Sequence, residues 1–165
     1  MITIFKTANR RLEEIQKPEP GCWVNVVDPS DEELAWLIQE FPWAEEYHLD
    51  PLDIDEKARA ERDEDVLFTL IKIPHFQGKK DEAPFVTIPM GVIQNNDYFI
   101  TITKEDNVIV NEFENNRVKN LQTQKHYRFL LLILLKTATK FLAHLREINK
   151  TVDQIEDDLQ LSMRN

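Results

Sequence analysis

The feature that most constrains the fold is a long, regularly spaced series of apolar residues toward the C-terminus. From about His126 onward, apolar side chains recur every seven residues in two series, which are the a and d positions of a heptad. The series are Leu131, Ala138, Leu145, Val152 and Leu159, and Leu134, Phe141, Ile148 and Ile155. No glycine or proline interrupts them, so they predict one helix of roughly 35 residues and about 50 Å. A helix of this length with one apolar stripe has to lie against other helices.

The apolar pattern is still running where the sequence stops at "LQLSMRN". We therefore expect the chain to have been cut from a longer protein. The change of pattern predicts two parts, a domain over residues 1–122 and the start of a coiled-coil-like stalk helix over residues 123–165.

The first part combines strand and helix signals. Short β-branched runs, "MITIF" and "CWVNVV", read as strands, and Ser30 with Glu33 forms a capping box that starts a helix. Later, "FVTIPMGVIQ" and "YFITIT" flank Asn95–Asp97, whose side chains tolerate the left-handed backbone of a tight hairpin turn. A weaker helix is expected in "EDNVIVNEFENNRVKN". This mixture predicts an α+β or α/β fold in which a mixed sheet lies between helix layers, an αβα sandwich.

Charge and cysteine content limit the partners and the cellular compartment that this chain can have. The net charge of −10 argues against nucleic acid and anionic membrane surfaces as partners, because both attract basic proteins. Cys22, the single cysteine, lies in an apolar run and is expected to be buried, which fits a reducing compartment. The longest apolar run, "FLLLILL", is far shorter than the roughly 20 residues that cross a bilayer.

An acidic segment, Leu49–Val66, is the main candidate for a binding site. A calcium loop starting at Asp53 fails, because Lys57 and Ala58 occupy positions that need an oxygen ligand and a glycine. Paired zinc ligands are lacking, and so are a nucleophile with a His partner and a glycine-rich phosphate loop, so we predict no enzymatic activity.

Two interpretations of this segment stay open. The first is a solvent-exposed helix that begins at Asp50–Pro51. Two i, i+4 ion pairs would stabilise it, Asp53 with Lys57 and Asp55 with Arg59. The second is a weak site for a hard cation held through oxygen atoms and retained waters, for which Mg²⁺ is the natural ion.

Four segments follow one another along the chain: "CWVNVVDPSDEELAWL", "HLDPLDIDEKARAERDEDVLFTLIKIP", "FVTIPMGVIQNNDYFITIT" and "EINKTVDQIEDDL". Taken in this order, they resemble the N-terminal cytoplasmic domain of the CorA magnesium transporters. The resemblance implies a homopentameric channel at the cell membrane, with cytoplasmic αβα domains and long helices forming a funnel. Its membrane helices and its Gly-Met-Asn motif would lie beyond Asn165, so the chain would touch the membrane only through missing segments.

The resemblance also implies a regulatory site. Divalent cations bridge neighbouring subunits in that family and hold the pore shut, and the bridging acids carry over to Asp55 and Glu56, with Asp153 on the long helix as a further ligand. The expected function is a cation-sensing domain of a transporter for Mg²⁺ or Co²⁺, with Mg²⁺ as a weak regulatory ligand. Alternatives are a zinc-transporting member of the family, or a soluble helix-mediated interaction module with no role in transport.

Overall fold

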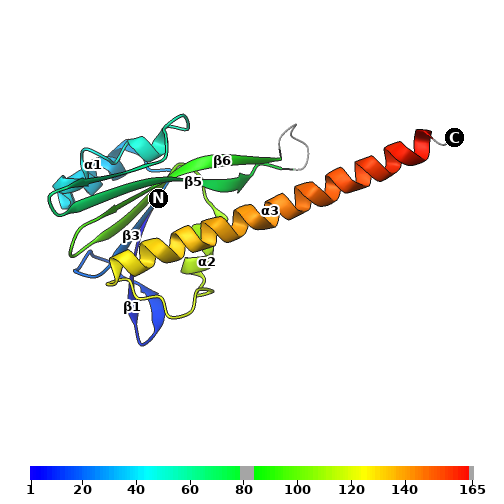
Figure 1. The fold of residues 1–165 in the computed structure, drawn as a ribbon. Coiled ribbons are helices and arrows are strands. Elements are labelled where there is room, and N and C mark those ends of the chain that lie inside the picture. The colour runs from blue at the N-terminus through cyan, green and yellow to red at the C-terminus, as the bar shows by residue number, and fades with distance from the viewer. Residues whose placement is uncertain (79–83, 164–165) are drawn as a thin grey trace.

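The structure, a computed structural model, describes residues 1–78 and 84–163. In these residues a seven-stranded mixed sheet forms the centre, with strand order β2-β1-β3-β7-β6-β5-β4 (Figure 1). The strands are β1 (Ile2–Ala8), β2 (Arg11–Glu14), β3 (Trp23–Val27), β4 (Arg59–Asp63), β5 (Val66–Phe76), β6 (Phe85–Gln94) and β7 (Phe99–Thr103). β3 and β7 run parallel and the other neighbouring pairs run antiparallel.

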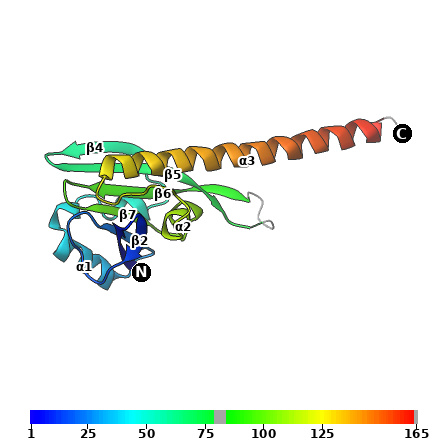
Figure 2. The ribbon, with the colours of Figure 1, turned by 90° about the horizontal axis from the view of Figure 1, so that it is seen from below.

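Helices cover both faces of this sheet, which confirms the predicted αβα sandwich. α1 (Asp31–Glu40) and the short 3-10 helices η1 (Pro42–Ala44) and η2 (Asp50–Leu52) belong to one side. α2 (Val108–Glu114) and α3 (His126–Met163) belong to the other, and Figure 2 shows α3 and α1 on opposite sides of the sheet. Successive strand residues alternate between the two cores, because side chains on a strand point to opposite faces. Val24 and Val26 thus pack toward α1, and Trp23 packs toward α3.

The start of α1 follows the predicted capping box. The hydroxyl oxygen of Ser30 accepts a hydrogen bond from the Glu33 amide at 3.2 Å, and the Glu33 carboxylate accepts one from the Ser30 amide at 3.0 Å. Glu33 also accepts a hydrogen bond from the N-terminal ammonium of Met1 at 2.8 Å, so one side chain joins α1 to the first strand. Cys22 is buried as expected.

The predicted hairpin is confirmed in its strands, but its turn is built differently from the expectation. β6 and β7 pair antiparallel on either side of it. The turn residues Asn95–Asp97 belong to the described part of the chain, and none of them has a positive φ. Instead, Asn95 Oδ1 accepts hydrogen bonds from the amides of Asp97 at 2.9 Å and Tyr98 at 2.8 Å. The asparagine side chain therefore closes the turn without left-handed backbone.

The predicted long helix is present as α3, which contains 38 residues. Its first turns pack on the sheet through Phe129, Leu130 and Ile133, which are buried. None of these three belongs to the heptad series, and Leu131 of that series is 64% exposed. Farther along α3 the heptad residues Phe141 and Ile148 line a hollow with Phe85 of β6, and Phe141 is half-buried.

The division at residues 122 and 123 stays a prediction.

A three-residue ionic contact joins α2 to α3. Glu112 on α2 accepts hydrogen bonds from Lys136 at 2.9 Å and from Lys140 at 2.7 Å. Burial alone raises the pKa of Glu112, but the two lysines together outweigh it and hold that pKa below its usual value. None of the helices in the described ranges combines the length and the hydropathy needed to cross a membrane.

Candidate functional site

The acidic segment does not form the salt-bridged α-helix that its i, i+4 spacing predicted. Asp50 and Pro51 open only the three-residue helix η2, a turn follows, and the chain then enters β4 at Arg59. β4 pairs antiparallel with β5 along its whole length. Main-chain hydrogen bonds to β5 satisfy this stretch, whereas i, i+4 ion pairs contribute only a few tenths of a kcal/mol each. The helical interpretation was therefore wrong.

Three carboxylates of this segment converge on one guanidinium. Arg59 donates hydrogen bonds to Glu56 at 2.6 Å and, through its other nitrogens, to Asp50 and Glu61. Its guanidinium carbon also lies 5.3 Å from the ring centre of Phe68. The hydrogen bond to Glu61 is the main cause that raises the pKa of Arg59; partial burial opposes it, and Asp50 adds to it. Arg59 is thus the charged centre of the segment.

The two residues predicted as cation ligands differ in their surroundings. Glu56 is half-buried and engaged with Arg59. Asp55 is exposed, and none of the ion pairs found among the described residues includes it. Its amide donates to Asp53 Oδ1 at 3.0 Å, which fixes the loop and leaves the Asp55 carboxylate facing solvent. Within residues 1–78 and 84–163, no three His, Cys, Asp or Glu side chains are placed to hold a metal ion together.

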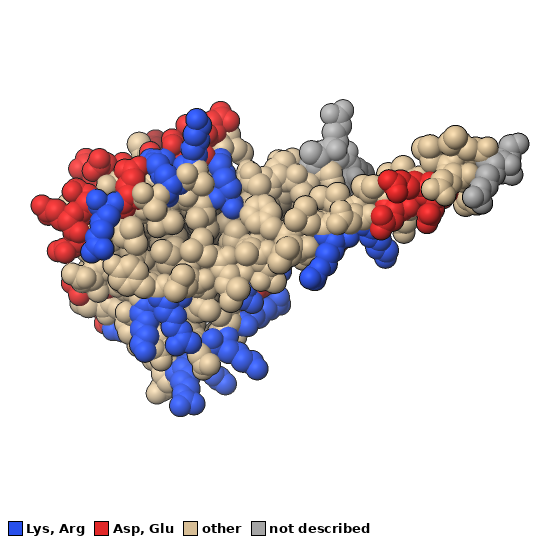
Figure 3. Space-filling model, in the orientation of Figure 1, with Lys and Arg blue, Asp and Glu red and all other residues tan. Residues whose placement is uncertain are grey.

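Asp153, the third predicted ligand, is not brought to this segment within one chain. The stretch of α3 that contains Ile148 and Val152 still lines a hollow with Phe76 and Phe85 of the β5–β6 hairpin. Beyond this hairpin, the C-terminal part of α3 extends away from the domain (Figure 1). Asp153 belongs to this exposed part. Figure 3 shows acidic side chains gathered on one side of the domain and a second group on the distal part of α3. A site that joins Asp153 to Asp55 and Glu56 would therefore need a second copy of the chain.

Sequence reasoning missed Asp50 and Glu61 as partners of Arg59. Arg59 and Glu61 are two residues apart, a spacing that brings side chains together on one face of a strand and separates them on a helix. The signal was present as the opposite charges at i and i+2 in "RAERD". It was overridden by the prediction that a helix starting at Asp50–Pro51 continued through this stretch.

Comparisons with known proteins agree on fold and family. The profile of the family described as CorA-like Mg²⁺ transporter protein matches residues 19–165. No curated protein matches the chain. The complete CorA magnesium transporter from Methanocaldococcus jannaschii superimposes with a TM-score of 0.79 at 19% identity, covering 96% of this chain and 51% of that one.

Two cytoplasmic or soluble domains are also similar. The soluble domain of CorA from the same archaeon gives a TM-score of 0.79 at 20% identity, covering 96% of this chain and 64% of that one. The ZntB cytoplasmic domain from Vibrio parahaemolyticus gives 0.71 at 14% identity, covering 92% and 63%. The chain thus spans about half of the complete transporter. By its sequence match and its fold, it belongs to the CorA-like Mg²⁺ transporter protein family.

Proposed function

We propose that the chain is the cytoplasmic, cation-sensing part of a transporter for divalent cations, Mg²⁺ or Co²⁺, and that the membrane-spanning pore belongs to segments outside this sequence. The observation that carries the proposal is the family match over residues 19–165, which includes the whole acidic segment. The full-length protein would then be integral to the cell membrane, with the described residues on its cytoplasmic side.

The acidic segment supports a regulatory role because its charges are poorly balanced. Seven consecutive residues contain four acids, Asp50, Asp53, Asp55 and Glu56. Of these, Asp50 and Glu56 pair with Arg59, which also pairs with Glu61. Exposed carboxylates such as Asp55 suit Mg²⁺, which keeps several of its waters and accepts one or two carboxylates.

Mg²⁺ between subunits would favour the closed state through charge. Acidic segments that face each other across an interface repel, and a bound Mg²⁺ offsets this repulsion when it is plentiful. Asp153 lies on the exposed distal part of α3, so we assign it to a neighbouring subunit of a homopentamer rather than to the same chain as Asp55 and Glu56. Closure then follows cytoplasmic Mg²⁺ by mass action.

The test is a current measurement on the full-length protein carrying Asp55→Asn with Glu56→Gln. The glutamine can still accept a hydrogen bond from Arg59, so the local structure is kept while two charges are lost. We expect closure to require a higher Mg²⁺ concentration. Glu45→Gln with Glu46→Gln, a pair of adjacent exposed acids, is the control that removes the same charge. Equal Mg²⁺ sensitivity of the two double variants would contradict the assignment.

Asp153→Asn tests the second half of the site in the same measurement. If Asp153 completes the site from a neighbouring subunit, its loss weakens closure and adds little to the loss of Asp55 and Glu56. Uptake assays with Mg²⁺, Co²⁺ and Zn²⁺ identify the transported ion. A protein that moves none of the three would favour the alternative, a soluble helix-mediated interaction module.

A further inference from the structure

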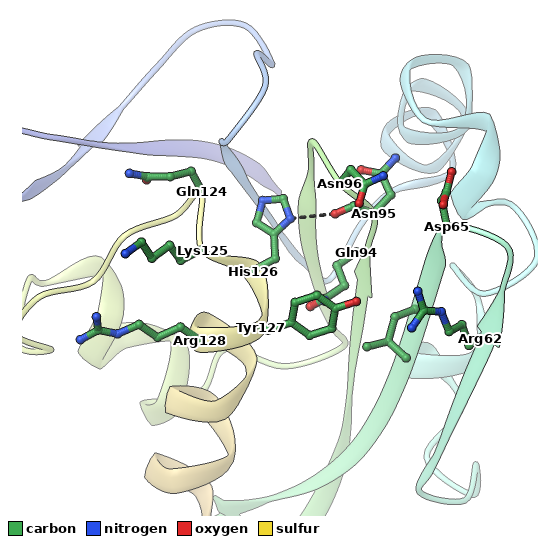
Figure 4. A pocket seen from close by; sticks show the side chains of 11 residues that line it. Arg62, Asp65, Gln94, Asn95, Asn96, Gln124, Lys125, His126, Tyr127 and Arg128 are labelled. Atoms are coloured by element: carbon green, nitrogen blue, oxygen red, sulfur yellow. Dashed lines mark hydrogen bonds between the residues drawn. The ribbon is translucent and has the colours of Figure 1, made fainter.

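A polar hollow of about 270 Å³ lies at the end of the sheet where α3 begins. Its walls come from three places in the chain. They are the turn between β4 and β5, the turn between β6 and β7, and residues 124–128 at the start of α3. Figure 4 shows Arg62 and Asp65 on one side of the hollow, the start of α3 on the other, and Gln94 with Asn95 between them. The acidic segment proposed to sense cations contributes only its last residues, Arg62 and Asp65.

The start of α3 has a charge arrangement that the helix dipole disfavours. The positive end of a helix favours acidic residues, as in the first turn of α1, which contains Asp31, Glu32 and Glu33. The first turn of α3 contains no acidic residue, and Lys125 and Arg128 flank its beginning. The start of α3 is therefore a region of positive potential in a chain whose net charge is −10.

Two deeply buried polar side chains that line the hollow have an atom without a hydrogen-bond partner among the described residues. Gln94 is 2% exposed and its Oε1 has no partner. His126 is 6% exposed; its Nδ1 lies 2.8 Å from the carbonyl oxygen of Asn95, while its Nε2 has no partner. Buried polar groups in folded proteins are almost always hydrogen-bonded, so the unpaired amide of Gln94 at the wall of this hollow indicates that a ligand binds there.

The chemistry of these groups identifies the kind of ligand. Because a carbonyl only accepts, Nδ1 of His126 carries a hydrogen, and Nε2 either donates in the imidazolium form or accepts in the neutral form. The Gln94 amide donates through its NH2 group once it is turned by 180°, a rotation that exchanges two atoms of similar size. Figure 4 shows the Gln94 side chain directed from β6 toward the start of α3, so its amide points into the hollow.

We propose that this hollow binds a small oxyanion, a phosphate or carboxylate group. Its oxygens would accept from the Gln94 amide and from Arg62 across the hollow. His126 is not a ligand in this arrangement, because its Nε2 faces away from Gln94 and Arg62 in Figure 4; it positions the wall of the hollow through its Nδ1 contact with the carbonyl oxygen of Asn95. Arg62 supplies the planar guanidinium that pairs with such groups through two hydrogen bonds. Lys125 and Arg128 extend away from Gln94 in Figure 4 and raise the positive potential at the mouth, against the single acid Asp65.

NMR spectroscopy on the whole chain, in buffer free of divalent cations, tests this proposal. Inorganic phosphate and acetate are titrated separately, each against sodium chloride at matched ionic strength. We expect saturable shifts of the Gln94 side-chain amide and the His126 ring resonances. Saturation by phosphate alone, by acetate alone or by both supports the site and identifies the oxyanion. Absence of saturation with both would overturn it, whatever the outcome of the Mg²⁺ experiments.

Variants separate this hollow from general attraction to basic surfaces. Arg62→Gln is expected to weaken binding about tenfold or more, because a charge-assisted hydrogen bond is lost. Arg10→Gln is the matched control, because Arg10 lies on a separate basic hollow with Arg11 and Lys119. Equal weakening by both variants would overturn the proposal. Gln94→Met, which removes the buried amide at similar volume, is expected to abolish saturable binding. If Gln94→Met does not fold, the comparison of Arg62→Gln with Arg10→Gln tests the proposal.

Discussion

Pro51 lies directly against the main chain of Gly91. A Cβ atom added at Gly91 would sit 2.1 Å from Pro51 Cγ, closer than side-chain atoms can approach, and 3.1 Å from Pro51 Cβ, which is a tight contact. Pro51 is buried and belongs to η2, and Gly91 lies in the middle of β6. The acidic segment is thus fixed to the sheet at its start by a contact that only glycine permits at position 91.

Gly91→Ala is expected to destabilise the domain by about 1–3 kcal/mol, because the methyl group displaces a rigid proline ring rather than a flexible side chain. Denaturant unfolding measures the change. Pro51→Ala provides the internal control, since it removes the Cγ that the new methyl meets. In the double variant, the Gly91→Ala penalty should fall to the level of an ordinary strand substitution. Simple additivity of the two single effects would show that the clash is relieved elsewhere.

Arg59→Gln is expected to lower the melting temperature and to make it more sensitive to Mg²⁺. The substitution removes the charge shared by Asp50, Glu56 and Glu61, and surface or half-buried pairs of this kind contribute about 1 kcal/mol. The remaining carboxylates repel each other, so added MgCl2 should restore stability more than NaCl of the same ionic strength.

Thermal unfolding of the Arg59→Gln chain in the two salts measures this difference. Lys57→Gln is the matched control, because it removes one nearby exposed positive charge that makes none of the ion pairs on Arg59. A Mg²⁺ effect of equal size in both variants would mean that the cluster around Arg59 has no special cation affinity.

Glu112→Gln is expected to cost about 1 kcal/mol at neutral pH, because the ion pairs with Lys136 and Lys140 are lost. The folded-state pKa of Glu112 lies below its usual 4.5, so its stabilising contribution is complete above about pH 4.5 and disappears as the pH falls through the folded-state value. The difference in unfolding free energy between the two proteins should therefore shrink toward zero in acid. Glu156→Gln on the exposed part of α3 should show no such convergence.

Glu114→Gln is expected to raise the stability of the domain at neutral pH, whereas Glu112→Gln lowers it. Burial is the main cause that raises the pKa of Glu114, and Asp106 and Glu14 add to it, while the hydrogen bond from Asn25 at 2.8 Å opposes it. A raised carboxyl pKa means that ionisation costs the folded state free energy, a cost that is absent below about pH 4.5 and grows as the pH rises to the folded-state value.

Glutamine at position 114 keeps an acceptor for Asn25 and removes that cost. We therefore expect Glu114→Gln to be more stable than the parent at pH 7 and equal to it in acid. Denaturant unfolding of both proteins at pH 7 and in acid measures the two differences in stability. A loss of stability at pH 7 would show that the carboxylate makes a stronger contact with Asn25 than its burial penalty.

Elements governed by neighbouring residues were predictable. Ser30 and Glu33 are three residues apart, so their capping box depends only on local backbone. Asn107 likewise starts α2, where its side chain accepts from the Val110 amide at 3.0 Å, although the sequence indicated only a weak helix there. The heptad series predicted α3 correctly as a single long helix.

The candidate site was less predictable. The sequence placed acids in the segment, but it paired Asp55 with Arg59 on a helix, and the structure pairs Arg59 with Asp50, Glu56 and Glu61. Whether Asp55, Glu56 and Asp153 bind a cation together stays a prediction. The hollow beside His126 was not predicted at all, because its walls come from turns that are distant in sequence.

By itself the sequence determined the caps, the strand alternation and the length of α3, because each depends on residues within a few positions of one another. Only the tertiary structure decided that the acidic segment is a short 3-10 turn and an edge strand. Pairing of β4 with β5 satisfies its main chain, and the contact between Pro51 and Gly91 joins residues 40 positions apart. Such contacts outweigh the few tenths of a kcal/mol that local ion pairs give to a helix, and no local pattern reports them.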